Sequence, residues 1–142
     1  MNLDLKNKIT FVTGASKGIG ATVARIFAEE GADVVVSYHQ DHEGARRTAE
    51  SVRSMGRQAW LCQMDVGDPQ SIANAVRALP DHFQRLDILV LCAGKNVVTS
   101  FEEISADEWN EVLAVNLSGP FYVLQALTPL LNVRIKPLNR LL

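Results

Sequence analysis

Three glycines stand at fixed spacing within residues 13–20, Thr-Gly-Ala-Ser-Lys-Gly-Ile-Gly. Glycines in this pattern permit a tight turn, let a phosphate approach the backbone, and allow a helix to pack closely on a strand. The β-favouring run 9–12 precedes them, and apolar residues recur at helical spacing over 18–30. A helix that begins here directs free N–H groups and its positive dipole end at an anion. The segment predicts a pyrophosphate site for a dinucleotide; a glycine-rich turn without a ligand is the alternative.

The elements that must position this loop alternate between strand and helix. Further strands are predicted where short apolar or β-branched runs occur, over 34–36, 58–64 and 88–91. Helices are predicted from the N-cap Asp41 to Met55, after Asp68-Pro69, and from the capping box 105–108 towards 131. The helix after Asp68 is expected to carry four apolar residues on one face: Ile72, Val76, Leu79 and Phe83. This order predicts an α/β fold, a Rossmann-type doubly wound parallel sheet with ligands at the strands' carboxyl ends.

The composition excludes several classes of protein. The 142 residues are 47% hydrophobic and 21% charged with a net charge of −2, and the basic residues are scattered, so we expect no nucleic-acid partner. Cys62 and Cys92 lie in apolar runs without metal-ligand spacing, which predicts buried free thiols and no metal site. No apolar run is long enough to span a membrane, and residues 1–8 lack the pattern of a signal peptide. A cytoplasmic location is expected.

The loop also carries a resemblance to a known family. Thr13, Gly14, Gly18 and Gly20 match the pattern TGxxxGxG of short-chain dehydrogenases/reductases, and residues 3–131 most resemble the 3-oxoacyl-carrier-protein reductase-like branch. The resemblance includes Asp65 with Val66 after the third predicted strand, and Ala93 with Gly94 after the fourth. It implies these cofactor-binding residues: Gly14, Ser16, Lys17, Gly18, Ile19, Gly20, Tyr38, His39, Asp65, Val66, Cys92, Ala93 and Gly94.

Two further positions take their expected roles from the resemblance. It implies that the Asp65 carboxylate meets the adenine amino group of the cofactor. It also implies that Asn116 bends a helix and holds a water in the proton relay, the supporting part of the catalytic site; a simple helix-junction residue is the alternative. Where the family usually has two asparagines before the Ala-Gly pair, this sequence has Leu91 and Cys92. Backbone contacts from the pair remain expected there.

The end of the second predicted strand bears on the choice of cofactor. An acid there would bond the ribose 2'-hydroxyl and select NAD, but the sequence has Ser37-Tyr38-His39. Lys17 occupies a position that is basic in NADP-preferring relatives, so it is placed to pair with a 2'-phosphate. We therefore expect NADP(H) to be preferred, with NAD(H) possible. The alternative is that Lys17 and His39 are solvated surface residues.

The residues that the family uses for catalysis are not found in the sequence. The resemblance implies a Tyr-x-x-x-Lys pair and a serine after a fifth strand, whereas four residues after Tyr38 and Tyr122 stand His42 and Ala126. Residues 132–142 include Arg134, Lys136, Arg140 and Pro137 and do not resemble the family. We expect residues 1–131 to form a NADP(H)-binding Rossmann part, truncated after about four strands and the helix 116–131, and residues 132–142 to form a tail unlike the family.

An incomplete fold predicts exposed apolar surface. The strand 88–91 would have an unpaired outer edge, and Phe121, Leu124, Leu127 and Leu131 would leave an apolar patch on their helix, so we expect a homo-oligomer. The favoured hypothesis is the N-terminal part of an NADP(H)-dependent oxidoreductase that acts on a small-molecule carbonyl or secondary alcohol. A non-catalytic dinucleotide-binding or interaction module is the second hypothesis, and an unstable fragment that binds no dinucleotide is the third.

Overall fold

The computed structural model describes residues 3–81 and 83–131. Four parallel strands form one sheet in the order β3-β2-β1-β4. Their bounds are β1 (Ile9–Thr13), β2 (Asp33–Tyr38), β3 (Ala59–Gln63) and β4 (Ile88–Leu91). The chain first adds strands on one side of β1 and then crosses to the other side, so β1 and β4 flank a topological switch point. The predicted Rossmann-type parallel sheet is confirmed.

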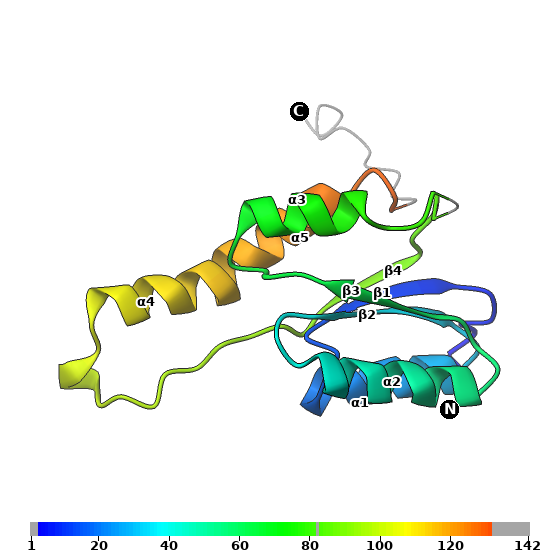
Figure 1. Ribbon diagram of the computed structural model, residues 1–142, viewed down its shortest axis with the longest axis horizontal. Helices are drawn as coiled ribbons and strands as arrows, with labels where there is room; N and C mark the ends of the chain where they lie inside the picture. Colours follow the sequence, from blue (N-terminus) through cyan, green and yellow to red (C-terminus); the bar gives the residue numbers. More distant parts are fainter. Residues whose placement is uncertain (1–2, 82, 132–142) are drawn as a thin grey trace, which may run out of the picture.

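Helices cover both faces of the sheet. Figure 1 shows α1 (Gly18–Glu29) and α2 (His42–Ser54) on one face, and α3 (Pro69–Arg77) and α5 (Gly119–Leu127) on the other. Phe11 and Val35 point into the layer beneath α3 and α5, whereas Val12 and Val36 point into the layer beneath α1 and α2. Because successive strand residues alternate between faces, this continuous apolar pattern is what a sheet covered on both sides requires.

Side chains cap the helices where the sequence predicts caps. The Asp41 carboxylate accepts the Gly44 N–H at 2.9 Å, and Asp68 accepts the Gln70 N–H at 2.9 Å. Ser105 and Glu108 form a reciprocal capping box at α4 (Ala106–Leu113). The Glu108 carboxylate accepts hydrogen bonds from the backbone N–H and the hydroxyl of Ser105. These bonds hold the pKa of Glu108 below its ordinary value.

Helix α3 is shorter than predicted. It ends at Arg77, and the Leu79 N–H bonds the Val76 carbonyl at 3.3 Å in a turn just before Pro80. Since proline has no N–H and disfavours a helical residue before it, the expectation that Leu79 and Phe83 extend this helix was wrong. Phe83 is nevertheless 6% exposed and packs edge-on against Trp60.

The long C-terminal helix that the sequence predicts is divided. Helix α4 passes into a π-helical turn, η2 (Ala114–Ser118), and α5 then begins at Gly119. A short 3₁₀ turn, η1 (Phe101–Glu103), lies between β4 and α4. In Figure 1 the segment after β4 runs out from the sheet, and α4 returns along it towards α5. Asn116 lies within the π-helical turn.

The apolar patch on α5 also differs from expectation. Leu127 is 0% exposed and belongs to the core with Val123, whereas Phe121 is 60% and Leu124 is 47% exposed. The inclusion of Leu127 in an uncovered patch was therefore wrong, because Val123 and Leu127, four residues apart, share the face that packs on the sheet. Leu131 is partly buried against the same core.

Strand β4 pairs with β1 alone within residues 3–81 and 83–131. Its residues are only partly buried, and Leu91 is 40% exposed. Just before β4, an isolated parallel bridge joins Leu86 to Leu131, and the Leu86 N–H donates to the Leu130 carbonyl at 2.8 Å. The expected tail 132–142 lies outside the described residues.

The two faces of α5 provide a stability test. Leu127→Ala should lower the free energy of unfolding by about 2–5 kcal/mol, because it opens a cavity in the core. Leu124→Ala, on the same helix, should cost about 1 kcal/mol or less. Urea titration followed by tryptophan fluorescence measures both. Equal losses from the two variants would contradict the burial described for α5.

Candidate functional site

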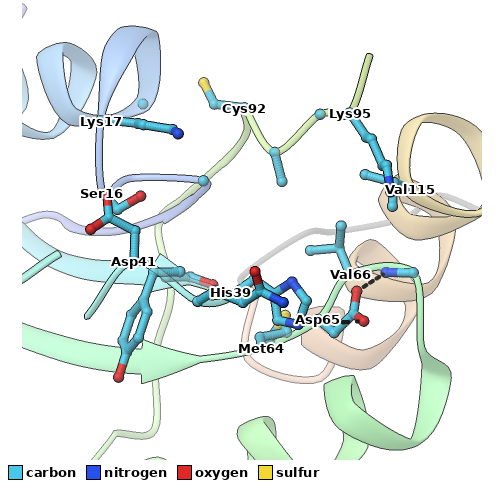
Figure 2. A pocket seen from close by; sticks show the side chains of 18 of the residues that line it. Ser16, Lys17, His39, Asp41, Met64, Asp65, Val66, Cys92, Lys95 and Val115 are labelled. Carbon is cyan, nitrogen blue, oxygen red and sulfur yellow. Dashed lines mark hydrogen bonds and ion pairs between the residues drawn. The ribbon is translucent and has the colours of Figure 1, made fainter. Parts of the chain in front are cut away.

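A cleft of about 730 Å³ lies at the carboxyl ends of the strands. Every residue predicted to bind cofactor lines it except Gly18, so the fold brings together segments that are far apart in the sequence. Figure 2 shows Lys17 projecting in from the loop after β1, His39 and Asp65 close together below it, and Lys95 on the opposite wall. The position agrees with the rule that parallel sheets bind ligands beyond their carboxyl ends.

Residues outside the predicted cofactor-binding set complete the walls of the cleft. They are Ser37, Gln40, Asp41, Met64, Gly67, Lys95, Glu111, Ala114 and Val115. Glu111, Ala114 and Val115 come from α4 and η2, a stretch of which only Asn116 was expected at the site. Their position at the cleft depends on the path of the chain after β4, which no local sequence pattern predicts.

The glycine loop is shaped by close approaches that leave no room for side chains. A Cβ at Gly20 would lie 2.3 Å from the Gly14 carbonyl oxygen, and a Cβ at Gly14 would lie 2.8 Å from the Ala93 Cα. Gly14 also has a φ of +63°. The first turn of α1 therefore packs against the loop that precedes it, and this loop packs against the chain at the end of β4. The Thr13 hydroxyl accepts the Ala93 N–H at 3.1 Å and ties the two strand ends together.

Helix α1 presents the N-terminus that the sequence predicts for an anion. Among the described residues no side chain caps it, in contrast to α2, α3 and α4. Its N-cap residue is Lys17, whose exposed side chain Figure 2 shows directed across the cleft. One edge of the cleft therefore holds the uncapped N–H groups of α1, the positive end of its dipole and the ammonium group of Lys17.

Asp65 is held rigidly at the end of β3. Its Oδ1 accepts the Gly67 N–H at 2.9 Å, and its own N–H donates to the Ser71 hydroxyl at 2.9 Å. Its Oδ2 lies 3.6 Å from His39 Nε2. One carboxylate oxygen is therefore used within the loop, and the other faces the imidazole.

The end of β2 offers no carboxylate at position 38. The Tyr38 hydroxyl is hydrogen-bonded to His42 Nδ1 at 2.8 Å, and the side chain packs in the core beneath α1 and α2, so the hydroxyl is engaged by α2. The nearby Asp41 carboxylate is used to cap that helix. Ser37 Oγ is buried and has no hydrogen-bond partner within the described part of the chain.

The two thiols have different environments. Cys62 is buried, as predicted, and burial raises the pKa of its thiol to about 12. Cys92 is only partly buried and lines the cleft, so the expectation that both thiols are buried was wrong for this one. Its position at the strand end, where the chain leaves the sheet, explains the difference.

Asn116 acts in the structure as a clip between two segments. Its Oδ1 accepts the Lys95 N–H at 2.8 Å, and its Nδ2 donates to the Lys95 carbonyl at 2.8 Å. The π-helical turn therefore holds the loop after β4 at the cleft, and Lys95 Nζ is also paired with Glu111. The role of Asn116 in a proton relay stays a prediction.

Neither a metal site nor a membrane-spanning helix is found in the described residues. No group of three or more histidine, cysteine, aspartate or glutamate side chains within 3–81 and 83–131 is arranged to hold a metal ion. In the same residues, no helix is both long and apolar enough to cross a membrane.

The family model for short chain dehydrogenase matches residues 8–136. The chain belongs to this family. It is 41% identical over 118 residues to 3beta-hydroxysteroid dehydrogenase 1 of Eggerthella lenta, a match that covers 83% of this chain and 45% of that protein. It is 38% identical over 122 residues to glucose 1-dehydrogenase 2 of Bacillus subtilis, a match that covers 85% of this chain and 47% of that protein.

Solved structures of short-chain dehydrogenases show the same fold. One from Burkholderia cenocepacia, in complex with NADP, superposes with a TM-score of 0.84 at 35% identity and covers 90% of this chain and 52% of that one. The chain thus spans about half the length of the relatives it matches. The relatives' names mark them as dehydrogenases, and oxidoreductase chemistry is the family's function.

The Asn116 clip can be tested by hydrogen exchange. Asn116→Ala should speed exchange of the Lys95 amide by about tenfold, because the N–H loses its acceptor. Asn116→Asp keeps an acceptor oxygen and should preserve most of the protection. Amide exchange measured by NMR on both variants checks this. Unchanged protection in Asn116→Ala would contradict the described hydrogen bond.

Proposed function

We propose that this chain binds a dinucleotide in the cleft and prefers NADP(H) to NAD(H). In this proposal it is the cofactor-binding part of an oxidoreductase that transfers a hydride between NADP(H) and a carbonyl or secondary alcohol. The observation that carries the proposal is the charge at the edge of the cleft. Lys17 and the uncapped N-terminus of α1 are positive, and Tyr38 stands where a carboxylate would select NAD.

The residues present fit a pyrophosphate group. At Gly14 and Gly20 any side chain would collide with backbone, and the first turn of α1 has no side-chain cap, so its N–H groups are open to an anion. Ser37 also lines the cleft, and its buried hydroxyl has no hydrogen-bond partner in the described part of the chain. The relative from Burkholderia cenocepacia, solved with NADP, supports the choice of cofactor.

The absence of a carboxylate matters because it changes the balance between the two cofactors. A carboxylate at the end of β2 accepts hydrogen bonds from a ribose diol and repels a 2'-phosphate. Here Asp41 is the nearest acid along the chain, and its Oδ1 is engaged by the Gly44 N–H. Lys17 has no ion pair among the described residues and stays available to a phosphate.

The chain's own residues supply binding and orientation. The bound nicotinamide would supply or accept the hydride. Proton transfer in the family uses a Tyr-x-x-x-Lys pair, which the 142 residues lack. Tyr38 is engaged with His42, and the Tyr122 ring packs edge-on against Phe121. We therefore propose that the chain alone holds the cofactor without turning it over.

One observation favours the second hypothesis, an interaction module. Leu117, Phe121 and Leu124 are 66%, 60% and 47% exposed along η2 and α5. An apolar strip of this kind is typical of an interface. Under this hypothesis the chain pairs with a second copy or a full-length relative. Size-exclusion chromatography with light scattering, at several concentrations, distinguishes a monomer from an assembly.

Cofactor preference can be measured by titration. We expect NADPH to bind more tightly than NADH, and Lys17→Ala to weaken NADPH binding by about tenfold while changing NADH binding little. Lys95→Ala, on the opposite wall, is the matched control and should leave the ratio of the two dissociation constants near that of the native chain. Isothermal titration calorimetry gives all six constants. Tighter binding of NADH by the native chain would overturn the preference.

Turnover can be tested separately from binding. The purified 142-residue chain should bind NADPH yet show no oxidation of it above background with aldehyde and ketone substrates, since the tyrosine-lysine pair is missing. Absorbance at the nicotinamide band follows oxidation, and mass spectrometry verifies the length of the chain. Steady oxidation proportional to protein concentration would contradict this proposal.

A further inference from the structure

Two titratable side chains meet where the dinucleotide is proposed to bind. His39 follows β2 and Asp65 follows β3, and their Nε2 and Oδ2 atoms lie 3.6 Å apart (Figure 2). The side chains are 53% and 38% exposed, and both residues line the cleft. They are therefore reached by solvent and by a ligand alike.

The position of His39 is fixed by its backbone. Its carbonyl accepts Gln63 Nε2 at 3.0 Å, and the preceding carbonyl, that of Tyr38, accepts the Met64 N–H at 2.8 Å. These bonds extend the pairing of β2 with β3 to the edge of the cleft. The imidazole is held beside Asp65, whose carboxylate is itself anchored by the Gly67 N–H.

The other charged groups come from four segments of the chain, which are the loops after β1 and β4 and the helices α2 and α4. Lys17 enters from the loop after β1, and Asp41 stands at the N-terminus of α2, where the Gly44 N–H engages it. His42, on α2, is hydrogen-bonded through Nδ1 to Tyr38. On the far wall, Lys95 and Glu111 neutralise one another. Asp65 is thus the carboxylate in direct contact with His39.

We propose that the charge of His39 sets how strongly this cleft prefers a 2'-phosphorylated dinucleotide, so that the preference declines as pH rises through neutrality. The inference rests on the proposed function and names a regulation of the same site. An imidazole is the side chain that changes charge between about pH 5 and 8. With an imidazolium, the His39–Asp65 pair has no net charge and presents a cation to a phosphate. With a neutral imidazole, the pair carries the charge of Asp65 alone.

The direction of the pH dependence follows from linkage. A 2'-phosphate is attracted by the imidazolium and repelled by the uncompensated carboxylate, so NADP binds the protonated form of the site better. Raising the pH removes that proton and weakens NADP binding relative to NAD.

The test is the ratio of the dissociation constants of NAD⁺ and NADP⁺, measured by calorimetry from pH 6.5 to 8.5 at constant ionic strength. The ratio cancels contacts that both dinucleotides share, including those of Asp65 with adenine. Below about pH 6.5 the 2'-phosphate itself takes up a proton, which would act in the opposite direction. We expect the ratio to fall by about fivefold across the range.

Three variants assign the effect to one side chain. His39→Gln should make the ratio low and nearly constant with pH, and His39→Arg should make it high and nearly constant. His42→Gln is the matched control, because His42 is a second histidine on the same segment but does not line the cleft, and this variant should keep the native fall.

Each outcome decides the proposal. A native ratio that does not change with pH, a fall that persists in His39→Gln, or a fall that disappears in His42→Gln overturns it while leaving the proposed cofactor binding intact. Failure of the native chain to bind either dinucleotide overturns the proposed function and this inference together. A fall that only the His39 variants abolish supports it.

Discussion

The site depends on one close approach between backbones, at the ends of β1 and β4. Gly14 meets Ala93, Gly20 meets the Gly14 carbonyl, and the Thr13 hydroxyl holds the Ala93 N–H. Because both residues are glycines and lack a Cβ, α1 can begin in contact with the ends of the strands. Its N-terminus therefore faces the cleft. The strand order switches at the same point, so the chain that follows β1 and the chain that follows β4 lead to opposite sides. The cleft occupies the space between them.

The electrostatics of the cleft follow from which groups are already engaged. Asp41 caps α2, Glu111 pairs with Lys95, and the Tyr38 hydroxyl is bonded to His42, so these polar groups are held by protein partners. Lys17, the start of α1 and the His39–Asp65 pair remain to meet a ligand. These are the groups on which the proposed preference for a 2'-phosphorylated dinucleotide rests.

Much of this could be predicted from local sequence because its causes are local. Caps such as Asp41 and Ser105, the glycine loop and the apolar strands each depend on neighbours within a few positions. The end of α3 was also local, since Pro80 marks it, but the apolar spacing up to Phe83 concealed it. The wall from Glu111 to Val115 and the direction of the Tyr38 hydroxyl arise from packing between distant segments, which no periodicity encodes.

The hydrogen bond from Ala93 to Thr13 joins residues 80 positions apart and has a consequence for folding. Such non-local contacts form late, since a long loop of chain must close before they contribute. During synthesis on the ribosome, β1, α1 and β2 emerge well before the segment that completes the cleft. A dinucleotide that recognises only the completed cleft would therefore select chains in which β4 has docked, and by mass action it would draw the folding equilibrium towards them.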